Sequence, residues 1–172
     1  MSSYRYDFNE IFDAHVPGPY DPERREFIEQ IASALYERVE ELPAIEEWPA
    51  PVRQFYALYD FNFQVGNGGF AQAAYNVPYL FPIVLNTFEI LGLEDAAAIC
   101  RKALAMLPDE INSQIEKGII DTDSLEDVFE HFDDSELAEL DEAIPDEFWA
   151  DDKLQQLAQE NQDAFLSIDS ML

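Results

Sequence analysis

The stretch YDFNFQVGNGGFAQAAYN, residues 59–76, combines closely spaced aromatic side chains with three glycines among four consecutive residues. Glycine is a poor helix former, so we expect the segment 66–69 to form a turn that interrupts a helix. The apolar spacing predicts one helix near 52–65 before this turn and short helices at 70–75 and 78–91 after it. This part of the chain therefore predicts a helical core broken by one glycine turn.

The rest of the sequence also favours helices, because its apolar residues recur with a spacing near 3.6 and no segment alternates as a strand would. A helix is expected over 22–42, with Asp21 as its cap and Pro22 in its first turn. Ser135 is a candidate cap for another. The further predicted helices are 93–107, 109–117, 123–132, 135–144 and 145–168. We expect an all-α fold, a single compact multi-helix domain over residues 1–172 with a strongly acidic C-terminal helical surface.

Aromatic residues are concentrated in the middle of the chain, where we expect them to build the core. Any apolar surface in excess of the core would favour a dimer interface. The residues assigned to the core are Phe55, Tyr56, Tyr59, Phe61, Phe63, Phe70, Tyr75, Tyr79 and Phe81.

The charge of the chain is strongly one-sided, with 37 Asp and Glu against 9 Lys and Arg, for a net charge of −28. Hydrophobic residues still make up 48% of the sequence, which is enough for a folded core. Direct binding to nucleic acid is excluded because it requires a basic surface, and docking on anionic lipid is disfavoured. No stretch approaches the roughly 18 apolar residues of a membrane span, and residues 1–20 lack a signal-peptide core. We therefore expect a cytoplasmic protein.

The acids gather in the last third of the chain, since residues 1–107 carry a net charge of −9 and residues 108–172 carry −19. Asp123, Glu126, Asp127 and Glu130 are spaced to share one face of a helix. The apolar residues of the same segment fall on the opposite face, which predicts a carboxylate ladder on an anchored helix. The apolar set is Leu125, Val128, Phe129 and Phe132.

This acidic surface has the charge density of a nucleic acid. A compact chain of this length is on the order of 40 Å across, and duplex DNA of that length carries roughly 24 charges. The surface is therefore expected to attract proteins that grip DNA, although an acidic surface that only aids solubility is the alternative. The carboxylates expected to stand in for phosphates are Asp121, Asp123, Glu126, Asp127, Glu130, Asp133, Asp134, Glu136, Glu139, Asp141, Glu142, Asp146 and Glu147.

Catalytic and metal-binding patterns are missing from the sequence. Calcium loops begun at Asp60 or Asp121 lack the acids and the glycine that such a loop needs at fixed positions. His15 and His131 are too few and too far apart for a paired-histidine zinc motif, and Cys100 falls on an apolar helix face. We expect no enzyme, no cofactor and no dedicated metal site.

The glycine-rich stretch contains an Asn-Gly-Gly-Phe-x-Gln pattern, and the chain resembles the DNA-mimic-protein-like domain family, an all-α bacterial family mostly of unknown function. The resemblance implies a homodimer that occupies the DNA-binding surface of a helix-turn-helix transcription factor. Relatives without strong acidity share the signature, so its residues indicate the fold, and inhibition is expected to rest on the acidic residues. The residues that match are Asn67, Gly68, Gly69, Phe70, Gln72 and Asn76.

Two functional hypotheses use the same electrostatics. The leading one is a DNA mimic that keeps a bacterial transcription factor off its operator and so regulates transcription. The alternative is an immunity-type inhibitor that blocks a basic nuclease toxin. Both predict a DNA-binding protein as the partner and no direct contact with nucleic acid or membrane.

Overall fold

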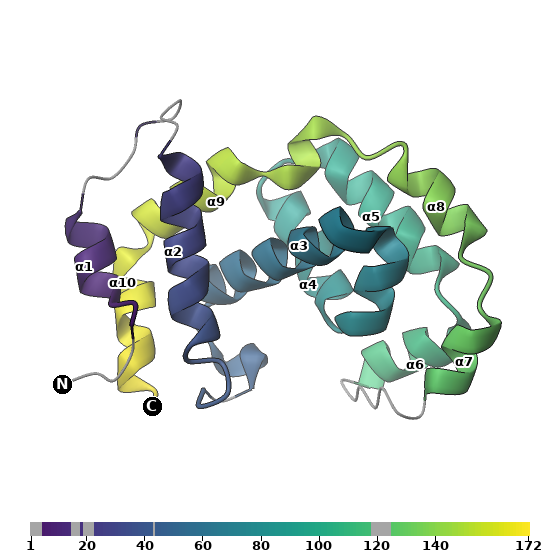
Figure 1. Cartoon of the computed structure of the whole chain (residues 1–172), viewed down its shortest axis with the longest axis horizontal. Helices are drawn as coiled ribbons and strands as arrows, with labels where there is room; N and C mark the ends of the chain where they lie inside the picture. Colours follow the sequence, from purple (N-terminus) through teal and green to yellow (C-terminus); the bar gives the residue numbers. More distant parts are fainter. Residues whose placement is uncertain (1–4, 15–17, 19–22, 43, 118–124) are drawn as a thin grey trace. The chain divides into compact units, whose positions relative to one another are not determined.

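The computed structural model describes residues 5–14, 18, 23–42, 44–117 and 125–172, and every regular element in these ranges is a helix (Figure 1). The all-α prediction is confirmed. Contacts between residues gather into two units, Met1–Tyr59 with Ala150–Leu172, and Asp60–Trp149. We call these the terminal unit and the central unit. Helix α3, Ala50–Asn76, contributes residues to both, and the single domain over 1–172 stays a prediction.

The terminal unit packs aromatic side chains from its N- and C-terminal segments together. Phe165 lies edge-on to Phe8, Phe12 and Phe55 with ring centroids 5.5–6.1 Å apart. Helix α2 contacts α1 and α9, and α1 also contacts α10. Besides the start of α3, its elements are α1 Phe8–Asp13, α2 Arg24–Tyr36, η1 Ile45–Glu47, α9 Asp151–Glu160, α10 Gln162–Leu166 and η4 Ser167–Ser170.

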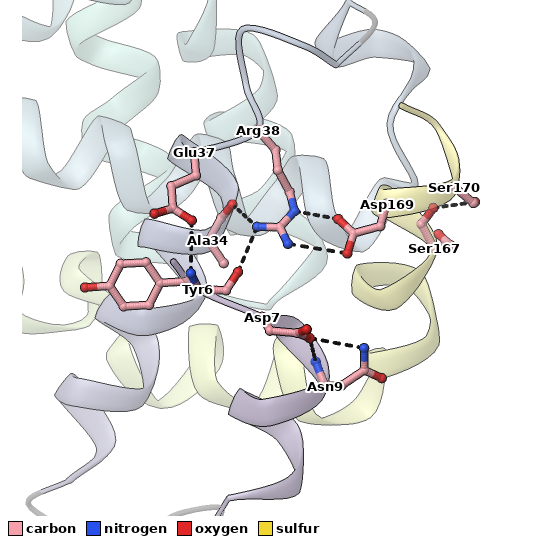
Figure 2. A network of polar contacts seen from close by, with 9 residues as sticks. All are labelled: Tyr6, Asp7, Asn9, Ala34, Glu37, Arg38, Ser167, Asp169 and Ser170. Carbon is pink, nitrogen blue, oxygen red and sulfur yellow. Dashed lines mark hydrogen bonds and ion pairs between the residues drawn. The ribbon is translucent and has the colours of Figure 1, made fainter. Parts of the chain in front are cut away.

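Arg38 joins three parts of this unit, as Figure 2 shows. Its side chain is fully buried and donates to the two carboxylate oxygens of Asp169 at 2.5 and 3.3 Å. It also donates to the backbone carbonyls of Tyr6 and Ala34, and its guanidinium lies 4.7 Å from the ring centroid of Phe8. A buried charge is stable only when it is paired and hydrogen-bonded. Arg38 meets that condition by linking the segment before α1, the end of α2 and η4.

The central unit surrounds Phe148 with other phenylalanines. The ring of Phe148 lies 5.7 Å from that of Phe70, nearly perpendicular to it, and 5.2 Å from that of Phe88. Helix α5 packs against α4, α8 and η3. Cys100, on the core face of α5, is fully buried. The unit contains the rest of α3, α4 Leu80–Ile90, α5 Glu94–Met106, α6 Asp109–Lys117, α7 Glu126–His131, α8 Ser135–Asp141 and η3 Asp146–Trp149.

The glycine turn is shorter than predicted. Helix α3 continues through Gly66 and Asn67, and only Gly68 and Gly69 leave the helical conformation. Gly69 has φ +73° and ψ −172°, a region of backbone space that is essentially restricted to glycine. The kink therefore depends on one glycine rather than on the whole run of four residues.

Other predicted helices also differ from the structure in their bounds. The helix expected over 22–42 extends only over Arg24–Tyr36, and its proposed cap, Asp21, lies outside the described residues. The helix expected over 135–144 ends at Asp141. The one expected over 145–168 is divided into η3, α9, α10 and η4, because Ala150 adopts a left-handed φ of 53° and Asn161 has a φ of −126°. Helix α1 was not predicted from the sequence; Asp7 caps it by accepting a hydrogen bond from the Asn9 amide.

Two of the aromatic residues assigned to the core are at the surface. Phe63 is 56% exposed and Tyr75 is 52% exposed, whereas Phe61, Phe70 and Phe81 are fully buried. Phe63 and Tyr75 therefore belong to the surface that can meet a partner.

In the described ranges, no helix has the length and the apolar character that crossing a membrane requires. The same ranges hold no group of three or more His, Cys, Asp and Glu side chains that is arranged to bind a metal ion.

Candidate functional site

The thirteen carboxylates expected to stand in for phosphates fall in the segment 121–147, which we call the acidic segment. Asp121 and Asp123 lie outside the described residues, and for Glu126 the structure describes only the backbone. Asp141 and Glu147 are half-buried. The exposed members are Asp127, Glu130, Asp133, Asp134, Glu136, Glu139, Glu142 and Asp146.

Helix α7 carries the part of the carboxylate ladder that the structure describes. The helix was expected over 123–132; its expected start lies outside the described residues, and the described helix ends at His131 rather than at residue 132. Asp127 and Glu130 are exposed, and Leu125, just before the helix, is buried with 1% exposure. The other predicted anchors are only half-buried: Val128, Phe129 and Phe132. The acidic face is therefore present at Asp127 and Glu130, while the apolar face is partly open.

Helix α8 displays acids on the outside and is anchored by one leucine. Leu137 is 1% exposed, and α8 packs against α5, whereas Glu136 and Glu139 point into solvent. The predicted cap, Ser135, is instead the first helical residue, and its amide donates to the Asp133 carboxylate at 3.1 Å. Hydrogen bonds from the Ser135 side chain and backbone lower the pKa of Asp133.

Asp141 has a structural contact inside the central unit. Its carboxylate accepts a hydrogen bond from the Phe70 amide at 2.9 Å, directly after the kink of α3. The amides at the start of a helix have no partner within the helix, so a carboxylate there acts as a cap. Burial raises the pKa of Asp141, and the hydrogen bond from Phe70 opposes that shift. A Cβ at Gly69 would overlap this carboxylate, so the glycine makes room for the cap.

Glu147 caps a second helix in the same way. One of its carboxylate oxygens accepts hydrogen bonds from the backbone amides of Asp95 and Ala96, both at 3.0 Å. These amides lie in the first turn of α5. Two of the thirteen carboxylates thus hold helix starts within the central unit, and the eight exposed ones remain available at its surface.

The signature residues form a small polar network around the kink. The Gln72 and Asn76 side chains donate to the same oxygen of Gln64, at 3.0 and 2.8 Å. Gln72 is therefore bonded to a neighbouring side chain, whereas the side chain of Asn67, another signature residue, is exposed. Gln64 was not among the predicted residues, although its place eight positions before Gln72, two turns along a helix, was a usable signal.

Asn62 is a second structural residue that the sequence pattern did not indicate. Its buried side-chain amide donates to the backbone carbonyls of Phe148 and Trp149, at 3.1 and 3.0 Å. These bonds fasten η3, at the end of the acidic segment, to α3. Nothing local in the sequence marks Asn62 for this role, because its partners lie 86 and 87 positions away.

Residues of α7 line two surface hollows. One is open to solvent between α3 and α7 and has a volume of about 420 Å³. The other is similar in volume and is lined by residues of α6 and α7, by the residue before α6 and by the two residues after α7: Pro108, Glu110, Asp127, Val128, His131, Phe132 and Asp133. Both are bordered by carboxylates and by apolar side chains. The acidic segment therefore borders hollows that are lined by both apolar side chains and carboxylates.

Comparisons with known proteins place these features in a family. The comparisons with curated proteins and with solved structures gave no match. The family model described as DMP19-like protein matches residues 46–164, a range that includes the kink of α3, both helix-capping carboxylates and the whole acidic segment. That range is more than half of the chain, and the chain therefore belongs to the DMP19-like protein family.

Proposed function

We propose that this protein is a non-catalytic DNA mimic that occupies the DNA-binding surface of a bacterial helix-turn-helix transcription factor and prevents it from binding its operator. The observation behind the proposal is the acidic segment, in which residues 121–147 include thirteen carboxylates and no Lys or Arg. Membership of the DMP19-like protein family, whose namesake is a DNA mimic protein, supports the same role.

The arrangement of the exposed carboxylates supports electrostatic competition with DNA. Neighbouring carboxylates on α7 and α8 stand three residues apart, at Asp127 and Glu130 and at Glu136 and Glu139. Three residues of α-helix advance about 4.5 Å along the axis, which is similar to the rise of about 3.4 Å between phosphates of one DNA strand. A protein surface that binds phosphates through lysine and arginine therefore meets carboxylates at a comparable axial spacing.

The first experiment identifies the partner. The tagged protein is used to capture proteins from a native bacterial lysate at low and at moderate salt, and the captured proteins are identified by mass spectrometry. We expect a helix-turn-helix protein whose capture weakens steeply with salt, because exposed charges are screened. Capture of a basic nuclease would support the immunity-type inhibitor instead.

The second experiment tests competition. In a mobility-shift assay, the protein should release operator DNA from the captured regulator and should not shift DNA by itself. A variant with neutralised surface carboxylates should lose this release. The exposed residues changed to Asn or Gln are Asp127, Glu130, Asp134, Glu136, Glu139 and Glu142.

The matched control removes the same number of charges elsewhere. Six exposed acids of the terminal unit are changed to Asn or Gln. Both variants then lose six negative charges, and only the location of the lost charges differs. If both variants lose release to the same extent, net charge and not the acidic segment carries the effect, and the proposal is wrong. The control residues are Glu10, Glu40, Glu46, Glu47, Asp152 and Asp163.

We also propose that the protein forms a homodimer whose interface avoids the acidic segment. Two copies carry twice the net charge of −28, and an interface across the carboxylates would be repulsive. Light scattering is expected to give twice the chain mass of 19.7 kDa at both low and high salt. A dimer that dissociates at low salt would place the carboxylates in the interface and contradict this arrangement.

A further inference from the structure

The hollow between α3 and α7 joins aromatic and acidic side chains in one surface depression. We call it the aromatic notch. It is lined by Ala71, Tyr75, Phe129, Glu130, Phe132 and Asp134. All six residues belong to the central unit, and no contact between described residues shows one of their carboxylates capping a helix as Asp141 and Glu147 do.

The aromatic wall of the notch is open to solvent. Tyr75 is 52% exposed although its helix neighbours Ala73 and Ala74 are fully buried. Its ring meets that of Phe129 edge-to-face, with centroids 4.8 Å apart and an interplanar angle of 67°. The face of an aromatic ring carries partial negative charge, so an exposed tyrosine attracts a cation to it.

The acidic side chains add a second source of negative charge at the same place. Glu130 and Asp134 line the hollow and are exposed, and neither forms an ion pair with any residue that the structure describes. The acidic segment supplies no lysine or arginine of its own to occupy the position. The notch is therefore complementary to a cation that comes from another molecule.

We propose that the aromatic notch binds an arginine side chain of the client's DNA-binding surface; this assignment rests on the proposed function and adds a specific contact to it. A guanidinium group is planar, stacks on aromatic faces and donates in a fork that matches carboxylates. Lysine is less suited, because its compact ammonium group is strongly hydrated and has no flat face to stack. The notch thus distinguishes arginine from lysine, which a surface of negative charge alone does not do.

Short peptides test this assignment without a client. Acetyl-Gly-Arg-Gly-amide and acetyl-Gly-Lys-Gly-amide are titrated into the full-length ¹⁵N-labelled protein at constant ionic strength and followed by NMR. The arginine peptide is expected to bind about threefold more tightly, with the largest shifts at the amides of the notch residues. Equal binding of the two peptides, or shifts centred elsewhere on the acidic segment, would overturn the proposal.

Variants at Tyr75 separate stacking from folding. Tyr75→Leu keeps apolar bulk but removes the ring and is expected to lower the affinity for the arginine peptide about threefold. Tyr75→Phe keeps the ring and should bind as the unmodified protein does, which also controls for damage to the helix. If Tyr75→Leu retains the full preference for arginine over lysine, the ring takes no part and the assignment is wrong.

Variants at the carboxylates separate the notch from general attraction. Glu130→Gln combined with Asp134→Asn is expected to weaken arginine-peptide binding about fivefold. The matched pair on α8, Glu136→Gln combined with Glu139→Gln, removes the same charge outside the notch and should weaken it less than about twofold. If the two double variants lose the same affinity for the arginine peptide, net charge explains the effect and the assignment of the notch is wrong.

Failure of the notch and failure of the proposed function give different results. If the arginine peptide shows no preference but operator DNA is still released from a regulator, the notch is wrong and the mimic role stands. If the peptide preference is observed but the captured protein does not bind DNA, the notch stands as an arginine site and the proposed function fails.

Discussion

The terminal unit bonds one carboxylate to a buried guanidinium and others to backbone amides, whereas the two structural carboxylates of the acidic segment are bonded to backbone amides. In the terminal unit, Asp169 is paired with a basic side chain, the buried guanidinium of Arg38. In the central unit, Asp141 and Glu147 are bonded instead to backbone amides at the starts of two helical segments. The first solution uses one of only nine basic residues in the chain, and the second uses none.

This difference shows how a folded protein can carry so large an excess of acid. Backbone amides at helix starts are available in every helical protein and attract negative charge, so they stabilise carboxylates without adding positive charge. A lysine or arginine in the same place would neutralise part of the acidic surface. The central unit thereby keeps its acidic segment free of cations and still holds the segment in place.

The largest expected effect comes from removing Arg38, the buried partner of Asp169 in the terminal unit. Arg38→Met should lower the free energy of unfolding by about 3 kcal/mol, because the buried side chain loses its hydrogen bonds to Asp169 and leaves the Tyr6 and Ala34 carbonyls without this donor. Chemical denaturation followed by circular dichroism measures this. Arg25→Met is the control, since the Arg25–Glu29 pair is exposed and should contribute less than about 0.5 kcal/mol. Similar losses in both variants would contradict a special role for Arg38.

The next largest effect comes from changing Gly69, which forms the kink of α3 and leaves room for the capping carboxylate of Asp141. Gly69→Ala should lower the free energy of unfolding by about 2–3 kcal/mol, because its backbone conformation is strained for alanine and the methyl group displaces the Asp141 carboxylate. Gly92 also has a positive φ, of 71°, but a Cβ there would meet nothing within 4 Å. Gly92→Ala should therefore cost only about 1 kcal/mol. Thermal denaturation of the two variants compares them directly, and equal costs would rule out the overlap at Gly69.

A smaller effect is expected when the capping carboxylate of Asp141 is removed and Gly69 is kept. Asp141→Ala should lower the free energy of unfolding by about 1 kcal/mol, since the Phe70 amide loses its acceptor. Glu142→Ala removes the same charge from the neighbouring exposed position and should leave stability within about 0.5 kcal/mol of the starting value. If the glutamate variant loses as much stability as the aspartate variant, charge and not capping is responsible.

The smallest effect is a difference in protonation between two aspartates. The pKa of Asp141 is raised by burial, and the pKa of Asp133 is lowered by its hydrogen bonds to Ser135. The stability linked to Asp141 is therefore present below its unfolded pKa and is lost as the pH rises through its folded pKa. For Asp133 the sign is opposite, so its contribution is lost as the pH falls through its folded pKa. Carboxyl ¹³C NMR titration should find Asp133 ionising at lower pH than Asp141, and the reverse order would contradict the two environments.

The elements that could be predicted from the sequence are those set by local spacing. Helix α6 occupies the predicted 109–117, and α5 lies within the predicted 93–107, because each has a continuous amphipathic repeat. The break at Ala150 was missed, since alanine is the strongest helix former and nothing nearby signals a left-handed conformation. The division of 145–168 into four elements therefore follows from tertiary packing.

The candidate site was predictable in its charge but not in its internal bonds. The spacing of Asp127 and Glu130 indicated an exposed acidic face, and both side chains are exposed. The caps at Asp141 and Glu147 join residues 71 and about 50 positions apart, so no local pattern distinguishes these carboxylates from their neighbours. Tyr75 was assigned to the core because aromatic residues are usually buried, and its exposure depends on how α7 packs beside it.

The burial of Cys100 has a practical consequence. Burial raises the pKa of this thiol to about 12, and the sequence contains no other cysteine, so the folded protein should present no reactive thiolate near neutral pH. A cysteine introduced at an exposed position of the acidic segment would then be the single site of labelling without replacement of the native residue. Spin labels or fluorophores placed one at a time along the segment can record, position by position, which parts a client covers.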